Sequence, residues 1–211
     1  MKRLTYQIVL LFSIILVSSA CKDISSVEAP YRISGDKVIK DAQTAEVVLK
    51  GVYSQFRSYN SVHALEFTSA LGLTSNSPSL AAYYNEVPIN NRDLLNIYSG
   101  NYKLIQETNL FLEKVNETSA DKLGGEPAKA NFLAEGHFIR ALAHFNLLRL
   151  FGQHYDTNSE YGIILRKQAA DEGSALPRST VAESYQFILD ELEMAITNLT
   201  QTSSFRANKD A

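Results

Sequence analysis

The 211-residue sequence is poor in the residues that define several common classes of protein. It has a single cysteine, Cys21, so it can form neither an intrachain disulfide nor a cysteine-based zinc cage. It has no tryptophan, five prolines and ten glycines, and none of them gather in a block typical of extended disorder. The formal net charge is −3 and no basic stripe is present, which argues against nucleic acid as a partner.

The amino terminus is typical of a secretory signal peptide. Lys2 and Arg3 precede Ile8–Val17, a run that is apolar except for Ser13, and small residues then lead to Cys21. The run is too short to span a bilayer stably. A cysteine in this place resembles that of a bacterial lipobox, although a plain signal peptide with an incidental cysteine is the alternative interpretation.

These features predict three regions along the chain. Residues 1–20 are the expected signal peptide, and Cys21 is the expected site of lipidation and first residue of the mature protein. Residues 21–40 lack a sustained period and are interpreted as a tether. The folded region is expected over 41–211.

Apolar residues at helical spacing predict four long helices. Asp41 is the expected N-cap of the first helix, Gly152 ends the third, and Thr180 and Glu183 form an S/T-x-x-E capping box that starts the fourth. The helices cover about Ala42–Tyr59, Asp93–Asn116, Lys129–Phe151 and a segment from Val181 onward. We therefore predict an all-α, TPR-like right-handed helical stack with long irregular loops. Because TSSFRANKDA resembles the start of another helix, we also expect this domain to be incomplete at its carboxyl end.

Residues 61–91 form a long excursion rich in serine and asparagine, with a short helix expected near Val62–Leu71. Loops of this length inside a domain are often binding elements. Tyr83, Tyr84 and Asn85 are the candidate ligand contacts, because aromatic rings stack on sugars and amides bind hydroxyl groups. The alternative is a solvated loop whose tyrosines pack on the body of the protein.

The stretch AEGHFIRALAHFNLLRLFG, Ala134–Gly152, combines histidines, arginines and a glutamate with an apolar helical pattern. His137 and His144 are seven residues apart, which is ~10.5 Å along a helix and too far for direct ligation of one metal ion. No G-x-S-x-G, P-loop or H-E-x-x-H motif is present, so no catalytic residue, metal or cofactor is predicted.

A structural role is the favoured interpretation of this helix. Glu135 and Arg140 are expected to pair with neighbouring helices or loops, and Arg140 and Arg149 to bind carbonyl groups at helix ends. The expected apolar stripe consists of Phe138, Ala141, Leu142, Phe145, Leu148 and Phe151.

The same helix resembles the signature helix of the SusD/RagB family. Two further stretches, YKLIQETNLFLEKV and LPRSTVAESYQFILDELEMAITNL, are also similar to family segments. His144 departs from the pattern, since relatives usually carry tyrosine there. The matching residues are Tyr102, Ile105, Asn109, Glu135, Phe138, Arg140, Ala141, Ala143, Phe145, Leu147, Arg149, Phe151, Gly152, Arg178, Glu183, Tyr185, Ile188, Leu192 and Ala195.

The resemblance implies an outer-membrane lipoprotein on the extracellular side, without enzyme activity. Such proteins bind nutrient oligosaccharides, or peptides in some branches, and deliver them to a TonB-dependent, SusC-like transporter. A TPR-like scaffold lipoprotein for assembly of outer-membrane complexes, without a small ligand, is the alternative. A secreted hydrolase is a more distant one.

Overall fold

The computed structural model describes residues 38–60, 91–169 and 175–199, and those residues are helical apart from their connections. No strand occurs within these three ranges, in agreement with the predicted all-α class. None of the helices described is long and apolar enough to cross a membrane. The elements are α2 (Ala42–Asn60), α5 (Arg92–Glu117), the short 3₁₀ helix η3 (Ala120–Leu123), α6 (Glu126–Phe151) and α7 (Val181–Asn198).

Local capping determines where two of these helices begin, as the sequence predicted. The Asp41 carboxylate accepts a hydrogen bond from the Thr44 amide at 2.8 Å, and this bond holds the pKa of Asp41 below its ordinary value. At α7 the Glu183 amide donates to the Thr180 hydroxyl while the Thr180 amide donates to Glu183, which completes the capping box.

The third helix begins three residues earlier than predicted, at Glu126 instead of Lys129. Pro127 lies in its first turn, where a missing amide hydrogen costs nothing. Gly124 and Gly125 precede it with φ values of 92° and 102°, a left-handed backbone that favours glycine. The two glycines therefore turn the chain sharply from η3 into α6.

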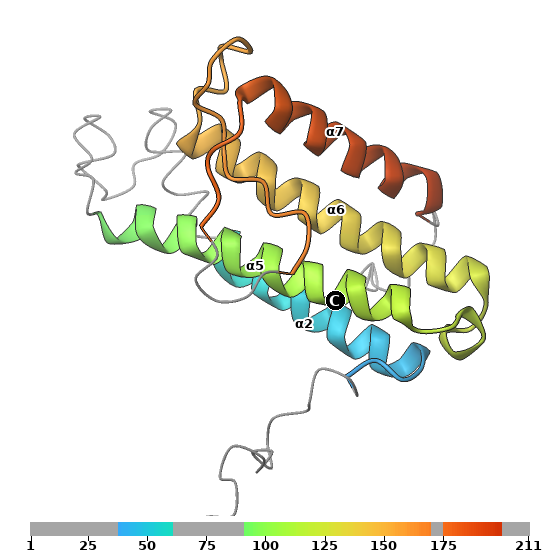
Figure 1. Ribbon diagram of the computed structural model, residues 1–211. Helices are drawn as coiled ribbons and strands as arrows, with labels where there is room; N and C mark the ends of the chain where they lie inside the picture. Colours follow the sequence, from blue (N-terminus) through green and yellow to red (C-terminus); the bar gives the residue numbers. More distant parts are fainter. Residues whose placement is uncertain (1–37, 61–90, 170–174, 200–211) are drawn as a thin grey trace, which may run out of the picture. The chain divides into compact units, whose positions relative to one another are not determined.

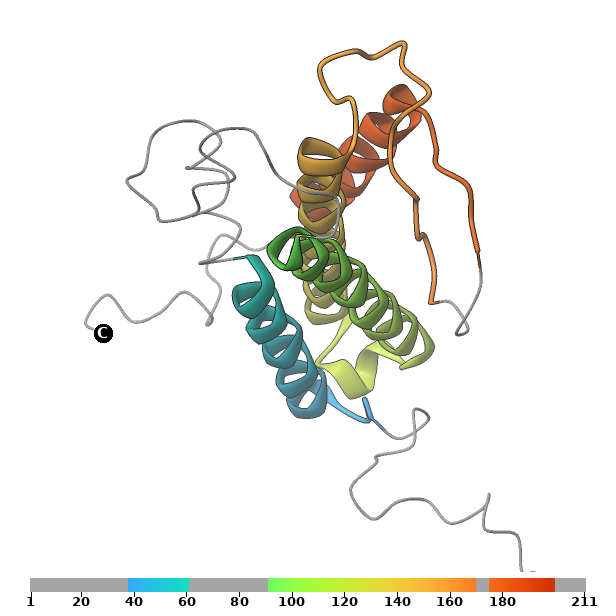
Figure 2. The ribbon, with the colours of Figure 1, turned by 90° about the vertical axis from the view of Figure 1, so that its left-hand side faces the viewer.

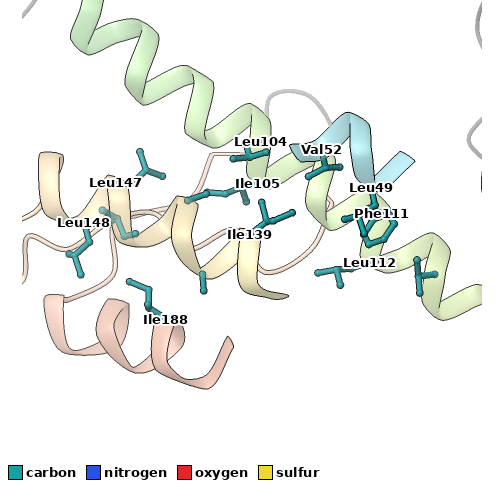
Figure 3. Packing of buried hydrophobic residues seen from close by; sticks show 14 of the residues in the cluster. Leu49, Val52, Leu104, Ile105, Phe111, Leu112, Ile139, Leu147, Leu148 and Ile188 are labelled. Atoms are coloured by element: carbon teal, nitrogen blue, oxygen red, sulfur yellow. The ribbon is translucent and has the colours of Figure 1, made fainter. Parts of the chain in front are cut away.

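Helix α6 is the centre of the packing, and the other three long helices lie against it (Figures 1 and 2). It contacts α7, α5 and α2, and α2 also packs on α5. Figure 3 shows how side chains from all four helices share one apolar core. The labelled core residues are Leu49 and Val52 of α2, Leu104, Ile105, Phe111 and Leu112 of α5, Ile139, Leu147 and Leu148 of α6, and Ile188 of α7.

The predicted apolar stripe of α6 is partly wrong. Ala141 and Leu148 are buried, but Phe138 and Phe145 are 37% and 38% exposed. Burial on α6 does not follow a single stripe, because the helix packs against three other long helices. Three polar residues of the same helix are buried instead, namely Glu135, Arg140 and His144.

Gly136 lets α5 approach α6 closely. A Cβ atom at this position would lie 2.6 Å from Leu112 Cδ2 and 3.3 Å from Phe111 Cδ1, both on α5. Only a residue without a side chain fits this contact without a shift of its neighbours.

Candidate functional site

The candidate ligand residues Tyr83, Tyr84 and Asn85 lie outside the residues that the structure describes, and so do Cys21 and the short helix expected at Val62–Leu71. What the structure does describe is the environment of the buried polar residues on α6. These residues meet an extended segment, residues 161–169, which we call the strap.

Side chains of α5 hold the strap by its backbone. The Tyr102 hydroxyl donates to the Ile164 carbonyl at 3.1 Å and accepts from the Ile164 amide at 3.2 Å. Asn109 donates to the Arg166 carbonyl at 3.1 Å. A tyrosine hydroxyl thus takes both of the hydrogen-bonding roles that a peptide group of an adjacent strand would take.

Arg140 connects three elements. Its guanidinium donates to both Glu191 oxygens on α7, from Nε and Nη2, each at 2.7 Å. Nη1 donates to Asn109 Oδ1 on α5 at 2.8 Å and to the Lys167 carbonyl of the strap at 2.9 Å. The prediction that Arg140 pairs with neighbouring helices and loops is confirmed.

Glu191 is buried but remains ionised. Burial opposes its charge, yet hydrogen bonds from His137 and Arg140 outweigh that cost, so the pKa of Glu191 lies below its ordinary value. His137 Nδ1 is 2.9 Å from Glu191 Oε2. This carboxylate is therefore the negative centre of the network, and Arg140 supplies the compensating charge.

His144 is fixed as a neutral ring by its two partners. The Arg166 amide can only donate, so His144 Nε2 accepts its hydrogen bond at 3.3 Å. Nδ1 then carries the proton and donates to the Arg140 carbonyl at 2.8 Å. Burial lowers the pKa of His144 to about 4, in agreement with a neutral imidazole.

Glu135 joins α6 to α2. The hydroxyl of Tyr53 donates to its Oε2 at 2.9 Å, and Asn131 donates to its Oε1 at 2.9 Å. Burial and then the negative charge of Glu135 raise the pKa of Tyr53, so the phenol stays protonated and keeps its hydrogen bond. The expected pairing of Glu135 with a neighbouring helix is confirmed.

Arg178 takes the role at the end of α6 that the sequence suggested for Arg149. It donates to the Phe151 carbonyl at 3.0 Å and to the Gly162 carbonyl of the strap at 2.8 Å. Arg149 lies instead 3.4 Å from Asn146 of its own helix. The Arg149 side chain is exposed on α6.

The two histidines of α6 contact different groups of Arg140, since His137 Nδ1 lies 3.3 Å from its Nη2 and His144 Nδ1 donates to its backbone carbonyl. His137 contacts Glu191, whereas His144 lies between the Arg140 carbonyl and the strap. Across the described ranges no group of three metal-ligating side chains occurs. The chemistry of this region is therefore that of a fixed polar frame which holds the strap across α5, α6 and α7.

Sequence reasoning missed the partners in this frame. Glu191 and Asn109 lie 51 and 31 positions from Arg140, and the sequence gives no signal of their distance in space. One signal was available: Asn109 and Glu191 interrupt otherwise apolar helical faces. Because buried polar groups require hydrogen-bond partners, such interruptions indicate residues that pair with other elements.

The described helices form a stack in which α2 packs on α5, α5 on α6 and α6 on α7, as expected of a TPR-like fold. The family model described as SusD-like, "Starch-binding associating with outer membrane", matches residues 20–211. The chain belongs to this SusD-like family, and the resemblance stated from its helical motifs is confirmed.

Individual relatives agree with this assignment. A SusD-like protein of Bacteroides ovatus is 28% identical over 111 residues, which cover 53% of this chain and 19% of that protein. A putative sugar binding protein of Bacteroides vulgatus is 26% identical with a TM-score of 0.67, over 77% of this chain and 38% of that one. A SusD superfamily protein of Bacteroides thetaiotaomicron is 23% identical with a TM-score of 0.65, over 78% and 38%.

The likeness to these solved structures confirms the predicted TPR-like all-α fold. The chain spans less than two fifths of the length of the two solved structures and about a fifth of the Bacteroides ovatus relative.

Proposed function

We propose that this chain is a surface lipoprotein of the bacterial outer membrane that captures nutrient oligosaccharides and passes them to a TonB-dependent transporter. Peptides are the second ligand class. The observation that carries the proposal is the match of residues 20–211 to a family described as starch-binding and associated with the outer membrane. A cysteine at position 21, which follows an apolar amino-terminal run and three small residues, supports lipid anchoring.

In this proposal Tyr83, Tyr84 and Asn85 contact the ligand. Tyrosine rings stack on sugar faces, and an amide group binds hydroxyl groups in either direction. The excursion that carries them joins α2 to α5, and both helices are packed on α6. A binding loop held at both ends by a rigid scaffold loses less entropy when it binds.

Calorimetry on the whole mature chain tests ligand binding, with Cys21→Ser to keep the protein in solution. The panel contains maltooligosaccharides, other plant and host glycans, and short peptides. We expect binding to at least one glycan, and a drop of about tenfold or more in affinity in the combined Y83A/Y84A/N85A variant, since each lost stacking contact costs about 1 kcal/mol.

Tyr155→Ala is the matched control, because Tyr155 is a tyrosine with 78% exposure in a different loop. Its affinity should equal that of the unsubstituted chain. A folded protein that binds no member of the panel contradicts glycan capture. Binding that survives the triple substitution contradicts only the assignment of these three residues.

Membrane attachment and the transporter are tested separately. Cys21→Ala should release the chain from the outer membrane fraction, because the lipid anchor is lost. Co-purification of the lipidated chain with a large TonB-dependent barrel is the expected result. Recovery of an envelope assembly complex in its place would favour the scaffold alternative, and turnover that a single carboxylate substitution abolishes would favour a hydrolase.

A further inference from the structure

The strap covers a fully buried histidine, His144 of α6. The ring lies edge-on to Phe187 of α7, with ring centroids 4.9 Å apart, and its Nε2 accepts the hydrogen bond of the Arg166 amide in the strap. Figure 2 shows the strap as an orange trace that runs beside the helices and belongs to none of them. Because α6 and α7 form part of the apolar core, displacement of the strap exposes His144 to water at the smallest loss of contacts.

Acid can act on the strap through His144. In the part of the chain that the structure describes, five side chains hold the backbone of residues 163–169 by hydrogen bonds. Four of them supply two hydroxyl groups, an amide and a guanidinium, whose charges do not change between pH 5 and pH 7. These four are Tyr102, Asn109, Arg140 and Ser184. The fifth is His144, and imidazole is the side chain that ordinarily titrates in this range.

The protonated imidazole does not fit the closed arrangement. In the neutral ring Nδ1 donates to the Arg140 carbonyl, and Nε2 accepts from the Arg166 amide. A proton on Nε2 would place two donors 3.3 Å apart with no acceptor between them. The bond to the Arg140 carbonyl lies within α6 and survives protonation. The bond that protonation removes is therefore the one to the strap.

The charges on α6 and α7 leave the neutral ring favoured. Burial is the largest cause that holds the pKa of His144 at about 4, and the positive charge of Arg140 adds to it. Glu191 of α7 acts in the opposite direction. Its two oxygens are already engaged by the Arg140 guanidinium, and one of them also contacts His137, so this carboxylate is not available as a new partner.

The neighbours on the strap and on α5 bring no negative charge to the ring within the described residues. Lys167 of the strap is itself positive and lies 5.4 Å from the centroid of the Phe187 ring. On α5 the hydroxyl of Tyr102 and the amide of Asn109 are neutral, and burial raises the pKa of Tyr102, so the phenol stays protonated. Release of the strap is therefore the route by which His144 becomes charged.

The strap has a fixed part and a releasable part. The Gly162 amide donates to the Ser179 carbonyl at 3.0 Å, the Ser179 amide donates to the Ile163 carbonyl at 2.8 Å, and Ile163 is 2% exposed. These are backbone and apolar contacts, which do not titrate. Residues 164–169, beyond them, are half-buried or exposed. We call residues 164–169 the latch.

We propose that the latch is released by acid: protonation of His144 at Nε2 removes the acceptor of the Arg166 amide, and residues 164–169 leave α5 and α6 while the helical core stays folded. The hydrated ring of the open form has the ordinary pKa of 6.5, whereas the closed ring has a pKa of about 4, so a bound proton favours the open form. The closed latch is thus most stable above pH 6.5 and loses stability as the pH falls toward 4. Release is reversible, and it does not rest on the proposed ligand or transporter.

Amide hydrogen exchange at pH 7 and pH 5, on the whole mature chain with Cys21→Ser, tests the proposal. Each rate is divided by that of an unstructured chain at the same pH, so that opening alone is compared. We expect opening at the Ile164 and Arg166 amides to increase about twentyfold at pH 5. At both pH values these amides should exchange faster than those of Leu147 and Ile188 in the helices. Equal protection of the latch and the helices would mean that the latch opens only when the whole protein unfolds, and this result overturns the proposal.

His144→Gln is the matched variant, since glutamine keeps an acceptor and a donor but does not titrate. Its latch should stay protected and should change by less than about twofold between pH 7 and pH 5. His154→Gln removes an exposed histidine outside the strap and should retain the full change. A change of the same size in H144Q as in the unsubstituted chain overturns the role of His144.

A reciprocal test leaves His144 in place. Tyr102→Phe removes both bonds to Ile164 and should make opening of the latch about tenfold easier. Linkage then requires that His144 takes up its proton more readily, so the midpoint of its ring titration, followed by nuclear magnetic resonance, should rise by about one pH unit. Tyr185→Phe, which removes a hydroxyl outside the strap, should leave the midpoint where it is. An unchanged midpoint in a folded Y102F protein overturns the proposal.

Discussion

Arg140 and Glu191 face each other across the interface of α6 and α7, joined by two parallel hydrogen bonds of 2.7 Å. Both side chains are almost fully buried. The two-pronged geometry suits the planar guanidinium and fixes the rotation of each helix relative to the other. The same guanidinium also holds the strap through the Lys167 carbonyl, so one side chain sets the position of three elements.

Removal of one charge from this pair should cost much more than removal of a surface charge. Glu191→Gln leaves Arg140 buried and uncompensated, and we expect the free energy of unfolding to fall by about 3 kcal/mol. Glu46→Gln, which removes a surface pair with Lys50, should cost less than about 1 kcal/mol. Urea titration of both variants measures the difference, and equal losses would show that the buried pair contributes nothing special.

His144 should make stability depend on pH. Its folded-state pKa of about 4 lies below the ordinary 6.5, so the unfolded chain binds the proton more tightly and the stabilisation is lost as pH falls from 6.5 toward 4. Between pH 7 and pH 5 we expect a loss of about 2 kcal/mol in the free energy of unfolding. Glu191 contributes little to the pH dependence in this range, because its pKa is lowered from 4.5 and its contribution to stability is lost only as the pH falls below that value.

In His144→Phe this part of the pH dependence should disappear, although the variant loses the hydrogen bond to the Arg166 amide and is less stable overall. His154→Gln is the control, because His154 is exposed in a loop. Denaturation at several pH values gives the slope. A His144→Phe variant with the unchanged slope would assign the pH dependence to other groups.

Two glycine-to-alanine substitutions should change the free energy of unfolding in opposite directions. Gly51 in α2 has no atom within 4 Å of a built Cβ, so Gly51→Ala should stabilise the protein by up to about 1 kcal/mol through helix propensity. At Gly136 the new methyl group meets Leu112, and we expect a net loss of about 1–2 kcal/mol. Thermal unfolding compares the two. In an L112A background the cost of G136A should be smaller than in the unsubstituted chain, and an equal cost there would mean that the contact with Leu112 is not its cause.

Loss of one hydroxyl should loosen the strap. Tyr102→Phe removes both bonds to Ile164 and leaves the ring in place, so exchange of the Ile164 amide should accelerate on the order of tenfold. Tyr185→Phe removes a hydroxyl that donates to the His154 carbonyl, outside the strap, and should leave Ile164 unaffected. Hydrogen exchange resolved to single residues measures both, and similar exchange at Ile164 in all three proteins would contradict the role of Tyr102.

Helix positions could be predicted because their signals are local. Asp41 and the Thr180–Glu183 box start their helices where the sequence indicated, since a cap depends only on residues within one turn. The start of α6 was placed too late. The prediction relied on the apolar period, which does not extend to the first turn because Glu126 and Pro127 are exposed.

Burial on α6 and the partners of its polar residues could not be read from the same pattern. A periodicity argument assumes that a helix has one buried face and one solvent-exposed face. Helix α6 packs against three other long helices, so the assumption fails there: Phe145 is partly exposed while His144 is buried. The bond of Glu135 to Tyr53 spans 82 positions in sequence. Ligand contacts at Tyr83, Tyr84 and Asn85 stay a prediction.

The way in which Tyr102 holds the strap has a consequence for solubility. An extended segment normally offers a row of amide and carbonyl groups that another extended chain can join, which is a route to aggregation. Here those groups are occupied by side chains of three helices: Tyr102 and Asn109 from α5, Arg140 and His144 from α6, and Ser184 from α7. The chain thus carries an extended segment whose amide and carbonyl groups already have hydrogen-bond partners, although the described residues contain no sheet.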